Sequence, residues 1–267
     1  MISSIAHPTD FSPSSRVAYL HALALALAYR CKLYLLHVGG GEHGAAEGFP
    51  HIRETLADWG RLGTDASPED IEKTTGVAIR KVDIRDHYKI EALSEFMLSR
   101  EPGLIVAATH TDARQGLTSA RSVSAAIMRE TRIPTLFFGP SFSRPFIDAT
   151  GTIRLTRVLA PIDANPNPWP SVTALRELME PLAAPVHLAH VGDALPEGLH
   201  GAHSQIELLA KSGGIGDTLI AAARSADLVA MPTDPEKSFW ERLVGSPTTQ
   251  VVGAATSPVL LIPAEKD

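Results

Sequence analysis

A glycine-rich segment after the second predicted strand is the first feature of this sequence that could do chemistry. Residues 39–44 (GGGEHG) fit the pattern G-x-G-x-x-G, in which glycine amides approach a pyrophosphate at the start of a helix. Gly48 and Pro50 prevent a helix from beginning at Gly44, and the strand before the segment is the second of its domain. A flexible loop is therefore a better interpretation than a dinucleotide site.

Histidines are the other residue type that could bind or react. The sequence contains 11 histidines, of which His37, His43 and His51 form one group. No pair lies at i, i+4 on a predicted helix with a third ligand nearby, so strand-end or surface histidines are the better interpretation than a metal site. The patterns G-x-S-x-G and G-x4-G-K-[ST] do not occur. We therefore predict neither a hydrolase nucleophile turn nor an NTPase phosphate loop, and no catalytic set.

The composition is that of an ordinary globular protein. The residues are 44% hydrophobic, 20% charged and 6% aromatic. The length of 267 residues suggests two domains. The net charge of -6 and the lack of a Lys/Arg run speak against a nucleic-acid partner. Cys31 is the single cysteine, which excludes an internal disulfide and fits a reducing compartment. With no export signal, and an apolar stretch at 17–29 too short to span a membrane, we expect a soluble, cytoplasmic protein.

The chain repeats itself, with two different constant spacings. Pro8-Thr9-Asp10 recurs as Pro161-Ile162-Asp163, and His37 recurs as His190 at the same spacing. The later pairs, among them Ser122 with Ser246, share a shorter spacing. A duplication in which the second copy has lost residues from its middle explains both spacings. We therefore predict domains at 1–140 and 154–267, joined by a Pro- and Ser-rich linker at 141–153.

Short apolar runs and longer Ala- and Leu-rich runs alternate in both copies. The predicted strands are 2–6, 32–38, 77–83, 104–108 and 134–138, then 155–160, 186–190, 205–209, 228–231 and 259–262. The predicted helices are 14–29, 51–62, 88–100 and 122–131, then 171–182, 216–225 and 247–254. This alternation predicts α/β domains with a parallel sheet, helices on both faces, and ligands at the carboxyl ends of the strands.

These motifs resemble the universal stress protein family over essentially the whole chain. The first copy carries residues 8–12 (PTDFS), 35–38 (LLHV), 122–124 (SVS) and 133–136 (IPTL), and the second carries 241–246 (ERLVGS) and 257–263 (SPVLLIP). The resemblance implies two doubly wound domains, each a five-stranded parallel sheet of order 3-2-1-4-5. Because single-domain relatives typically dimerise through their last strand, it also implies an intramolecular pseudo-dimer, and leaves open a further homodimer.

Members of the family that hold ATP share the pattern G-x2-G-x9-G-[ST]. Its glycines let amides approach phosphates, and its last pair opens a helix. In the first copy these positions fall on Ala108, Thr111, Arg121 and Ser122, and in the second on Pro232, Pro235, Gly245 and Ser246. Phosphate binding is therefore weakened, although Arg114, Arg121, Lys237 or Arg242 could supply positive charge.

The resemblance also implies particular nucleotide-binding residues. Asp10 and Asp163 take the family position that faces the adenosine, and Val38 and Val191 the position beside adenine. Ser122, Gly245 and Ser246 complete the implied set. The alternative is that Asp10 caps the helix after Ser12-Pro13, that Ser122 and Ser246 cap the helices that follow them, and that the valines are core residues.

Two classes of function follow from the resemblance. The first is a non-catalytic stress-response protein that binds ATP, another adenine nucleotide or a small anionic ligand, and that changes its contacts with partners. The second is a ligand-free interaction scaffold of the same family. The altered glycine pattern favours this second hypothesis. An ATP-hydrolysing or adenylyl-transferring enzyme ranks third, because we find no catalytic set.

Overall fold

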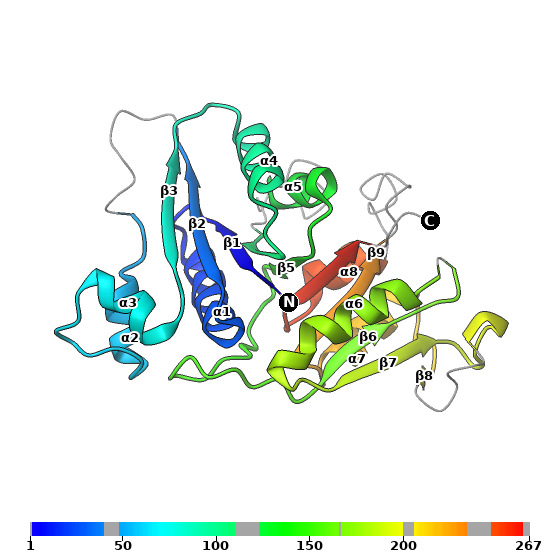
Figure 1. The fold of residues 1–267 in the computed structure, drawn as a ribbon. Helices are drawn as coiled ribbons and strands as arrows, with labels where there is room; N and C mark the ends of the chain where they lie inside the picture. The colour runs from blue at the N-terminus through cyan, green and yellow to red at the C-terminus, as the bar shows by residue number, and fades with distance from the viewer. Residues whose placement is uncertain are drawn as a thin grey trace. The chain divides into compact units, whose positions relative to one another are not determined.

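The computed structural model describes residues 2–39, 48–109, 123–165, 167–199, 206–233 and 247–263. Within these ranges strands and helices alternate along the chain, as the sequence predicts (Figure 1). The described residues group by their contacts into two compact units. The first unit takes residues from 1–108, 123–133 and 147–154, and the second takes residues from 109–122, 134–146 and 155–267.

The first unit combines parallel strands with helices on both faces. Its strands are β1 (Ser4–Pro8), β2 (Lys32–Val38), β3 (Ile79–Ile84) and β4 (Leu104–Ala108). Its helices are α1 (Pro13–Tyr29), α2 (Ile52–Asp58), α3 (Pro68–Thr75), α4 (Lys89–Arg100) and α5 (Val123–Thr131). Because side chains alternate along a strand, Ala6 packs with Met97 and Ile127 under α4 and α5, whereas His7 faces Ser15 of α1.

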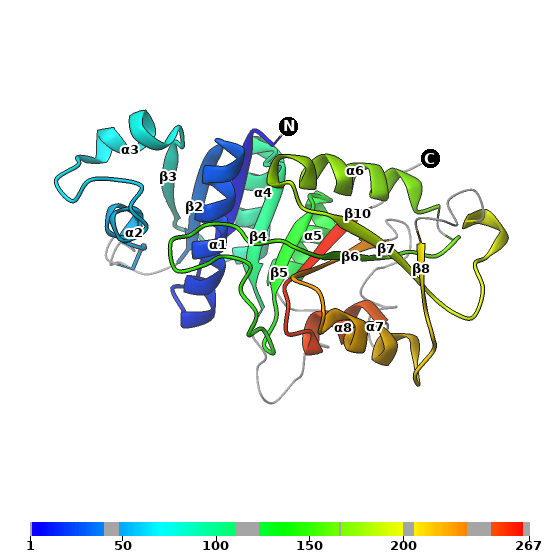
Figure 2. The same ribbon diagram turned by 90° about the horizontal axis from the view of Figure 1, so that it is seen from below.

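The second unit combines a mostly parallel set of strands with helices on both faces. Its strands are β5 (Thr135–Phe138), β6 (Val158–Pro161), β7 (Val186–Val191), β8 (Ile206–Leu209), β9 (Leu228–Thr233) and β10 (Val259–Pro263). Its helices are α6 (Trp169–Met179), the 3-10 turn η2 (Glu180–Leu182), α7 (Ile215–Ala223) and α8 (Pro247–Ala254). Helix α6 covers one face of the strands, and α7 and α8 cover the other (Figure 2).

The strand order confirms the predicted topology. The strands follow the order β3-β2-β1-β4-β5-β10-β9-β6-β7-β8, so each copy gives 3-2-1-4-5 when its strands are counted from its own start. The two final strands, β5 and β10, pair antiparallel with Leu136 opposite Leu260. The pairing confirms that the last strands of the two copies cover each other's edges within one chain.

Local chemistry explains where the long first helix begins and ends. Ser12 is its N-cap and accepts a hydrogen bond from the Ser15 amide at 3.2 Å, with Pro13 at the first helical position. The helix ends at Arg30, whose φ of 51° is left-handed. The alternating Ala and Leu of residues 21–28, which mimic a strand, are helical, because both residues have high helix propensity.

Several elements differ in their bounds from the sequence prediction, among them β1 and β6, which begin later, and α6, which begins and ends earlier. The helix predicted at 51–62 ends at Asp58, and a second helix, α3, follows it. Residues of the predicted linker are also ordered: Ser141 Oγ donates to Gly253 O at 2.9 Å in the second unit. In the first unit, the turn at 147–154 is held by an Ile147–Ile153 bridge, and a Cβ on Gly151 would lie 2.3 Å from the Trp59 ring.

Candidate ligand site at the carboxyl ends of the strands

The first strand of each copy lies at the point where strand order reverses. Strand β1 pairs with β2 on one side and β4 on the other, and β6 pairs with β7 and β9 in the same way. Successive connections leave such a strand in opposite directions, which opens a crevice at its carboxyl end. Asp10 follows β1 and Asp163 follows β6, so both implied carboxylates stand at a switch point.

Asp10 is exposed at the carboxyl end of β1. Its Oδ1 accepts a hydrogen bond from the Ser12 amide at 3.0 Å, so that the carboxylate shapes the turn into α1. The N-cap of α1 is Ser12, which corrects the alternative in which Asp10 caps the helix. Just before Asp10, the Thr9 amide donates to Leu36 O at 2.8 Å and fixes the turn to β2.

A buried polar chain lies directly beneath this turn. His7 Nδ1 lies 2.7 Å from Val106 O, and because a carbonyl can only accept, Nδ1 carries the proton. The Ser15 hydroxyl donates to Thr9 Oγ1 at 2.8 Å and lies 3.4 Å from His7 Nε2. Burial lowers the pKa of His7 to about 4. Since Ser15 is 2% exposed, this Ser–His pair positions the turn and is no nucleophile for a substrate.

Aromatic side chains pack beside the switch point of the first copy. Phe11, whose φ is 63°, stacks on His37 with ring centroids 4.4 Å apart and meets the Phe49 ring edge-on at 5.2 Å. His37 Nδ1 lies 2.9 Å from Asp83 Oδ1, which joins the carboxyl ends of β2 and β3. The His37 ring therefore contacts the Asp83 carboxylate and stacks on the Phe11 ring. His51 forms a separate pair with Glu54 at 3.5 Å.

The two implied valines have different surroundings. Val38 is 5% exposed and belongs to the core cluster that contains Ala6, Met97 and Ile127. Val191 is half-buried at the end of β7 and pairs with Leu209 of β8. Val38 is thus a core residue, whereas the side chain of Val191 is partly exposed at the carboxyl end of β7.

The switch point of the second copy brings Asp163 and His190 together. Asp163 Oδ1 accepts a hydrogen bond from the Ala164 amide at 2.7 Å and lies 3.9 Å from His190 Nδ1. The His190 ring also lies 3.1 Å from Ile162 O. The Asp163 side chain is 66% exposed and that of His190 is 11% exposed. The carboxylate is therefore presented to solvent beside a nearly buried imidazole.

Three implied residues, Ser122, Gly245 and Ser246, lie outside the described residues, as do the histidine His43 and the four compensating basic residues. Helix α5 begins at Val123 and α8 at Pro247, directly after these positions. The Ser124 hydroxyl donates to Ala108 O at 3.3 Å, so its side chain satisfies the end of β4. Pro232 lies within β9 opposite Ile262 and has no amide to offer a phosphate.

No group of three or more His, Cys, Asp or Glu side chains could hold a metal ion among the residues that the structure describes. Over that part of the chain, no helix is long and apolar enough to cross a membrane.

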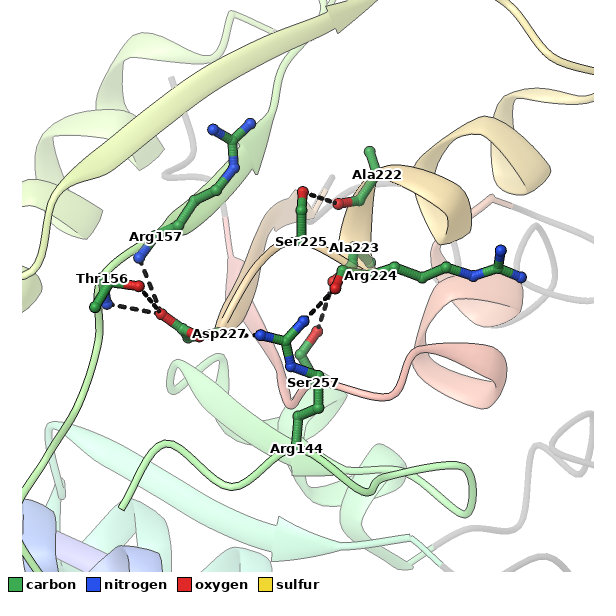
Figure 3. Close-up of polar contacts among 9 residues, drawn as sticks. All are labelled: Arg144, Thr156, Arg157, Ala222, Ala223, Arg224, Ser225, Asp227 and Ser257. Carbon is green, nitrogen blue, oxygen red and sulfur yellow. Dashed lines mark hydrogen bonds and ion pairs between the residues drawn. The ribbon is translucent and has the colours of Figure 1, made fainter. Parts of the chain in front are cut away.

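A second polar cluster occupies the opposite ends of the strands in the second unit (Figure 3). The Asp227 carboxylate accepts hydrogen bonds from the Thr156 amide and hydroxyl, both at 2.7 Å, and from the Arg157 amide at 3.1 Å. The Arg144 guanidinium lies 3.5 Å from Asp227 and also donates to Arg224 O. Partial burial acts to raise the pKa of Asp227, but the hydrogen bonds outweigh it, and the pKa lies below its ordinary value. Both oxygens of the Asp227 carboxylate have protein partners, so this residue serves structure.

The family assignment follows from the sequence and agrees with the fold. The sequence profile described as "Universal stress protein family" matches residues 1–138 and 150–263. The chain therefore belongs to the universal stress protein family, and its two matched stretches make it a tandem member, which confirms the resemblance. A search of curated proteins found no match.

Solved structures share the fold over nearly the whole chain. A universal stress protein of Archaeoglobus fulgidus is similar with a TM-score of 0.64 at 15% identity, covering 99% of this chain and 97% of that chain. A functionally unknown protein of Pseudomonas aeruginosa is similar with a TM-score of 0.67 at 15% identity, covering 98% and 92%. At such identities the likeness concerns the fold.

Sequence reasoning missed the polar chain beneath the first switch point. Its members are His7, Thr9 and Ser15, and the repeat gives no signal for them because Ala160, Ile162 and Pro168 stand at the matching positions of the second copy. One feature of the sequence could have indicated this polar chain. A histidine within a mostly apolar strand predicts a buried side chain that forms hydrogen bonds.

Proposed function

We propose that this chain is a non-catalytic, cytoplasmic stress-response protein that binds ATP or another small anionic ligand at the carboxyl ends of β1 and β6. Binding would change the contacts that the chain makes with its partners. Membership of the universal stress protein family supports this class of function. Catalysis ranks below binding, because we assign no nucleophile, acid and base set to either switch point.

The observation that carries the proposal is the repeated carboxylate at the switch point. Asp10 and Asp163 are both exposed, both follow the central strand of their copy, and both are anchored by a nearby backbone amide. Fixed, solvent-facing acceptors suit the hydroxyl groups of a sugar. Between the two, Asp163 is the better candidate, because its side chain is 66% exposed and the His190 ring 3.9 Å away adds a second polar group.

A ligand-free interaction scaffold is the second candidate, and Pro232 favours it. In β9, Pro232 stands where the family pattern of ATP-holding members has its first glycine, and it lacks an N–H. The matching position of the first copy is Ala108, whose carbonyl is already bonded to Ser124. Both changes weaken the backbone cradle that a triphosphate needs.

The first experiment asks what the protein carries when it is purified. The full chain is prepared without added nucleotide and denatured, and the released small molecules are identified by chromatography and mass spectrometry. The proposal expects ATP, ADP or AMP near one or two equivalents per chain. Release of nothing, followed by no thermal shift with millimolar ATP, would favour the scaffold.

Variants then locate the bound nucleotide. Asp163→Ala and Ser246→Ala should each lower the occupancy of the second copy, because the first removes an exposed acceptor and the second a hydroxyl that the family pattern implies for the ligand. Asp193→Ala is the matched control, since Asp193 is an exposed acid of the same unit. Equal occupancy in Asp163→Ala and Asp193→Ala would place the ligand elsewhere.

A further inference from the structure

A cavity of about 740 Å³ lies in the first unit between β3, α2 and α3. Ile79, Arg80 and Lys81 of β3 all line it. Side chains alternate between the two faces of a strand, so a cavity over one face would be lined by every second residue. Three consecutive lining residues place the cavity alongside the outer edge of the strand. Both ribbon views agree, with α2 and α3 beside the β3 edge (Figures 1 and 2).

The outer edge of β3 presents backbone groups to this cavity. Strand β3 is the last in the order and pairs with β2 alone among the described residues. The Leu33 amide donates to Ala78 O, and the Gly39 amide donates to Ile84 O, so the even-numbered residues of β3 bond to β2. In a parallel ladder the alternate residues point away, which turns the N–H and C=O of Ile79 and Lys81 toward the cavity. The Arg80 Nη1 group donates to Ile79 O at 3.3 Å, which agrees with an Ile79 carbonyl that points away from β2.

Among the described residues, the Arg and Lys side chains that line the cavity form no ion pair, and Lys81 Nζ lies 5.8 Å from the centroid of the Phe49 ring. Across the described residues, Arg53 and Arg80 form hydrogen bonds to carbonyl oxygens, to Ala66 O and Ile79 O, and no ion pair. Three carboxylates also line the cavity: Glu54 pairs with His51 at 3.5 Å, hydrogen bonds at the start of α3 lower the pKa of Glu69, and Glu72 is the third. Desolvation lowers the pKa of Lys81, so a carboxylate partner would stabilise its ammonium group.

We propose that the groove between β3 and α2–α3 binds an extended peptide with two neighbouring acidic residues, which adds to the sheet as a strand beside β3. The backbone of such a peptide would pair with the outward groups of Ile79 and Lys81. Arg80 and Lys81 project to opposite faces, so two adjacent acidic residues would meet one cation each. The predicted interaction surface belongs to the first copy, because the second connects its matching strands β7 and β8 by a shorter segment, in whose described residues no counterpart of α2 and α3 occurs.

The test uses the full chain and a fluorescein-labelled peptide of sequence Thr-Val-Glu-Glu-Val-Thr, with fluorescence anisotropy as the readout. Matched peptides replace the acidic pair with Gln-Gln or Lys-Lys. The acidic peptide should bind saturably, and the Lys-Lys peptide should bind at least about tenfold more weakly, since it places like charges together. Absence of saturable binding by the acidic peptide would overturn the proposal.

Two substitutions separate the backbone contact from the charge. Lys81→Ala removes the ammonium group and should weaken binding several-fold. Lys81→Pro also removes an amide that faces away from β2, a place where an edge strand tolerates proline, and it should abolish saturable binding. Equal affinity of the Ala and Pro variants would contradict strand addition.

Further measurements keep the test decisive. If Lys81→Pro fails to fold, an N-methylated version of the acidic peptide tests the same backbone bonds from the ligand side, and unchanged affinity would overturn the proposal. Light scattering of the protein alone tests the other occupant. Self-association that Lys81→Pro abolishes would assign the edge to a second copy of the chain instead.

Discussion

His7 and His21 are two histidines that the first unit buries, with relative exposures of 0% and 1%. Burial lowers both pKa values from 6.5 to about 4, because the charged ring would lose its hydration. In the unfolded chain the rings regain ordinary pKa values, so the unfolded state binds more protons between these limits. Stability is therefore highest above about pH 6.5 and falls as the pH drops toward 4.

The predicted size of this effect is about 2 kcal/mol of unfolding free energy per histidine between pH 7 and pH 5. His7→Gln should remove about that much pH dependence, because its amide can still donate to Val106 O without titrating. Urea unfolding at the two pH values measures the difference. The control is His87→Gln, at an exposed histidine. A pH dependence that is the same in His7→Gln and the wild type would show that His7 is not buried as described.

Asp227 makes a separate prediction at the residue scale. Asp227→Asn weakens a site that accepts three hydrogen bonds from Thr156 and Arg157, so it should cost about 1–3 kcal/mol in urea unfolding at neutral pH. Since the pKa of Asp227 is lowered, this contribution is present above the ordinary aspartate pKa and lost as the pH falls below it. Asp193→Asn, at an exposed acid, should stay within about 0.5 kcal/mol of the wild type. Equal effects of the two changes would contradict the network in Figure 3.

Most elements of the fold could be predicted from the sequence. The strand 32–38 and the helix 247–254 match in both bounds, because apolar runs end there at clear breakers. Strand β1 begins at Ser4 and ends at Pro8, later than predicted at both ends, since the polar His7 lies in the ladder through its pairing with Leu35. Helix α3 was missed, because its sequence PEDIEKTT has one apolar residue and no periodic face. The local signal for α3 is its N-cap Ser67, whose amide and hydroxyl donate to Asp70.

The pairing of β5 with β10 can be tested by a designed crosslink. Leu136 and Leu260 are directly opposite in an antiparallel ladder, which brings Cα atoms within the range that a disulfide spans. In a Cys31→Ala background, Leu136→Cys with Leu260→Cys should form an intramolecular disulfide on oxidation, seen by peptide mapping. The control pair replaces Leu260→Cys with Leu159→Cys on β6, three strands from β5 in the order. Crosslinking of the control alone, or of neither pair, would contradict the strand order.

At the scale of the whole molecule, duplication explains both what could be predicted and what could not. The family resemblance implied the strand order, and the repeat matched Asp10 with Asp163, because matched residues must take matched places in two copies of one fold. It gave no signal for the peptide groove, which the first copy forms from α2 and α3. It also gave none for the anchoring of the linker, where Ser141 bonds to Gly253 and Gly151 packs on Trp59. Such contacts depend on one copy only.

Nucleotide binding at the repeated switch points is the central claim, and calorimetric titration of ATP into the nucleotide-stripped full chain tests it most directly. We predict saturable binding of one or two equivalents. Affinity should fall at least about tenfold when Asp10→Ala and Asp163→Ala are combined, because each removes an exposed acceptor at its switch point. Undiminished binding in the double variant would contradict the assigned sites, and no binding at all would leave the chain as a ligand-free scaffold.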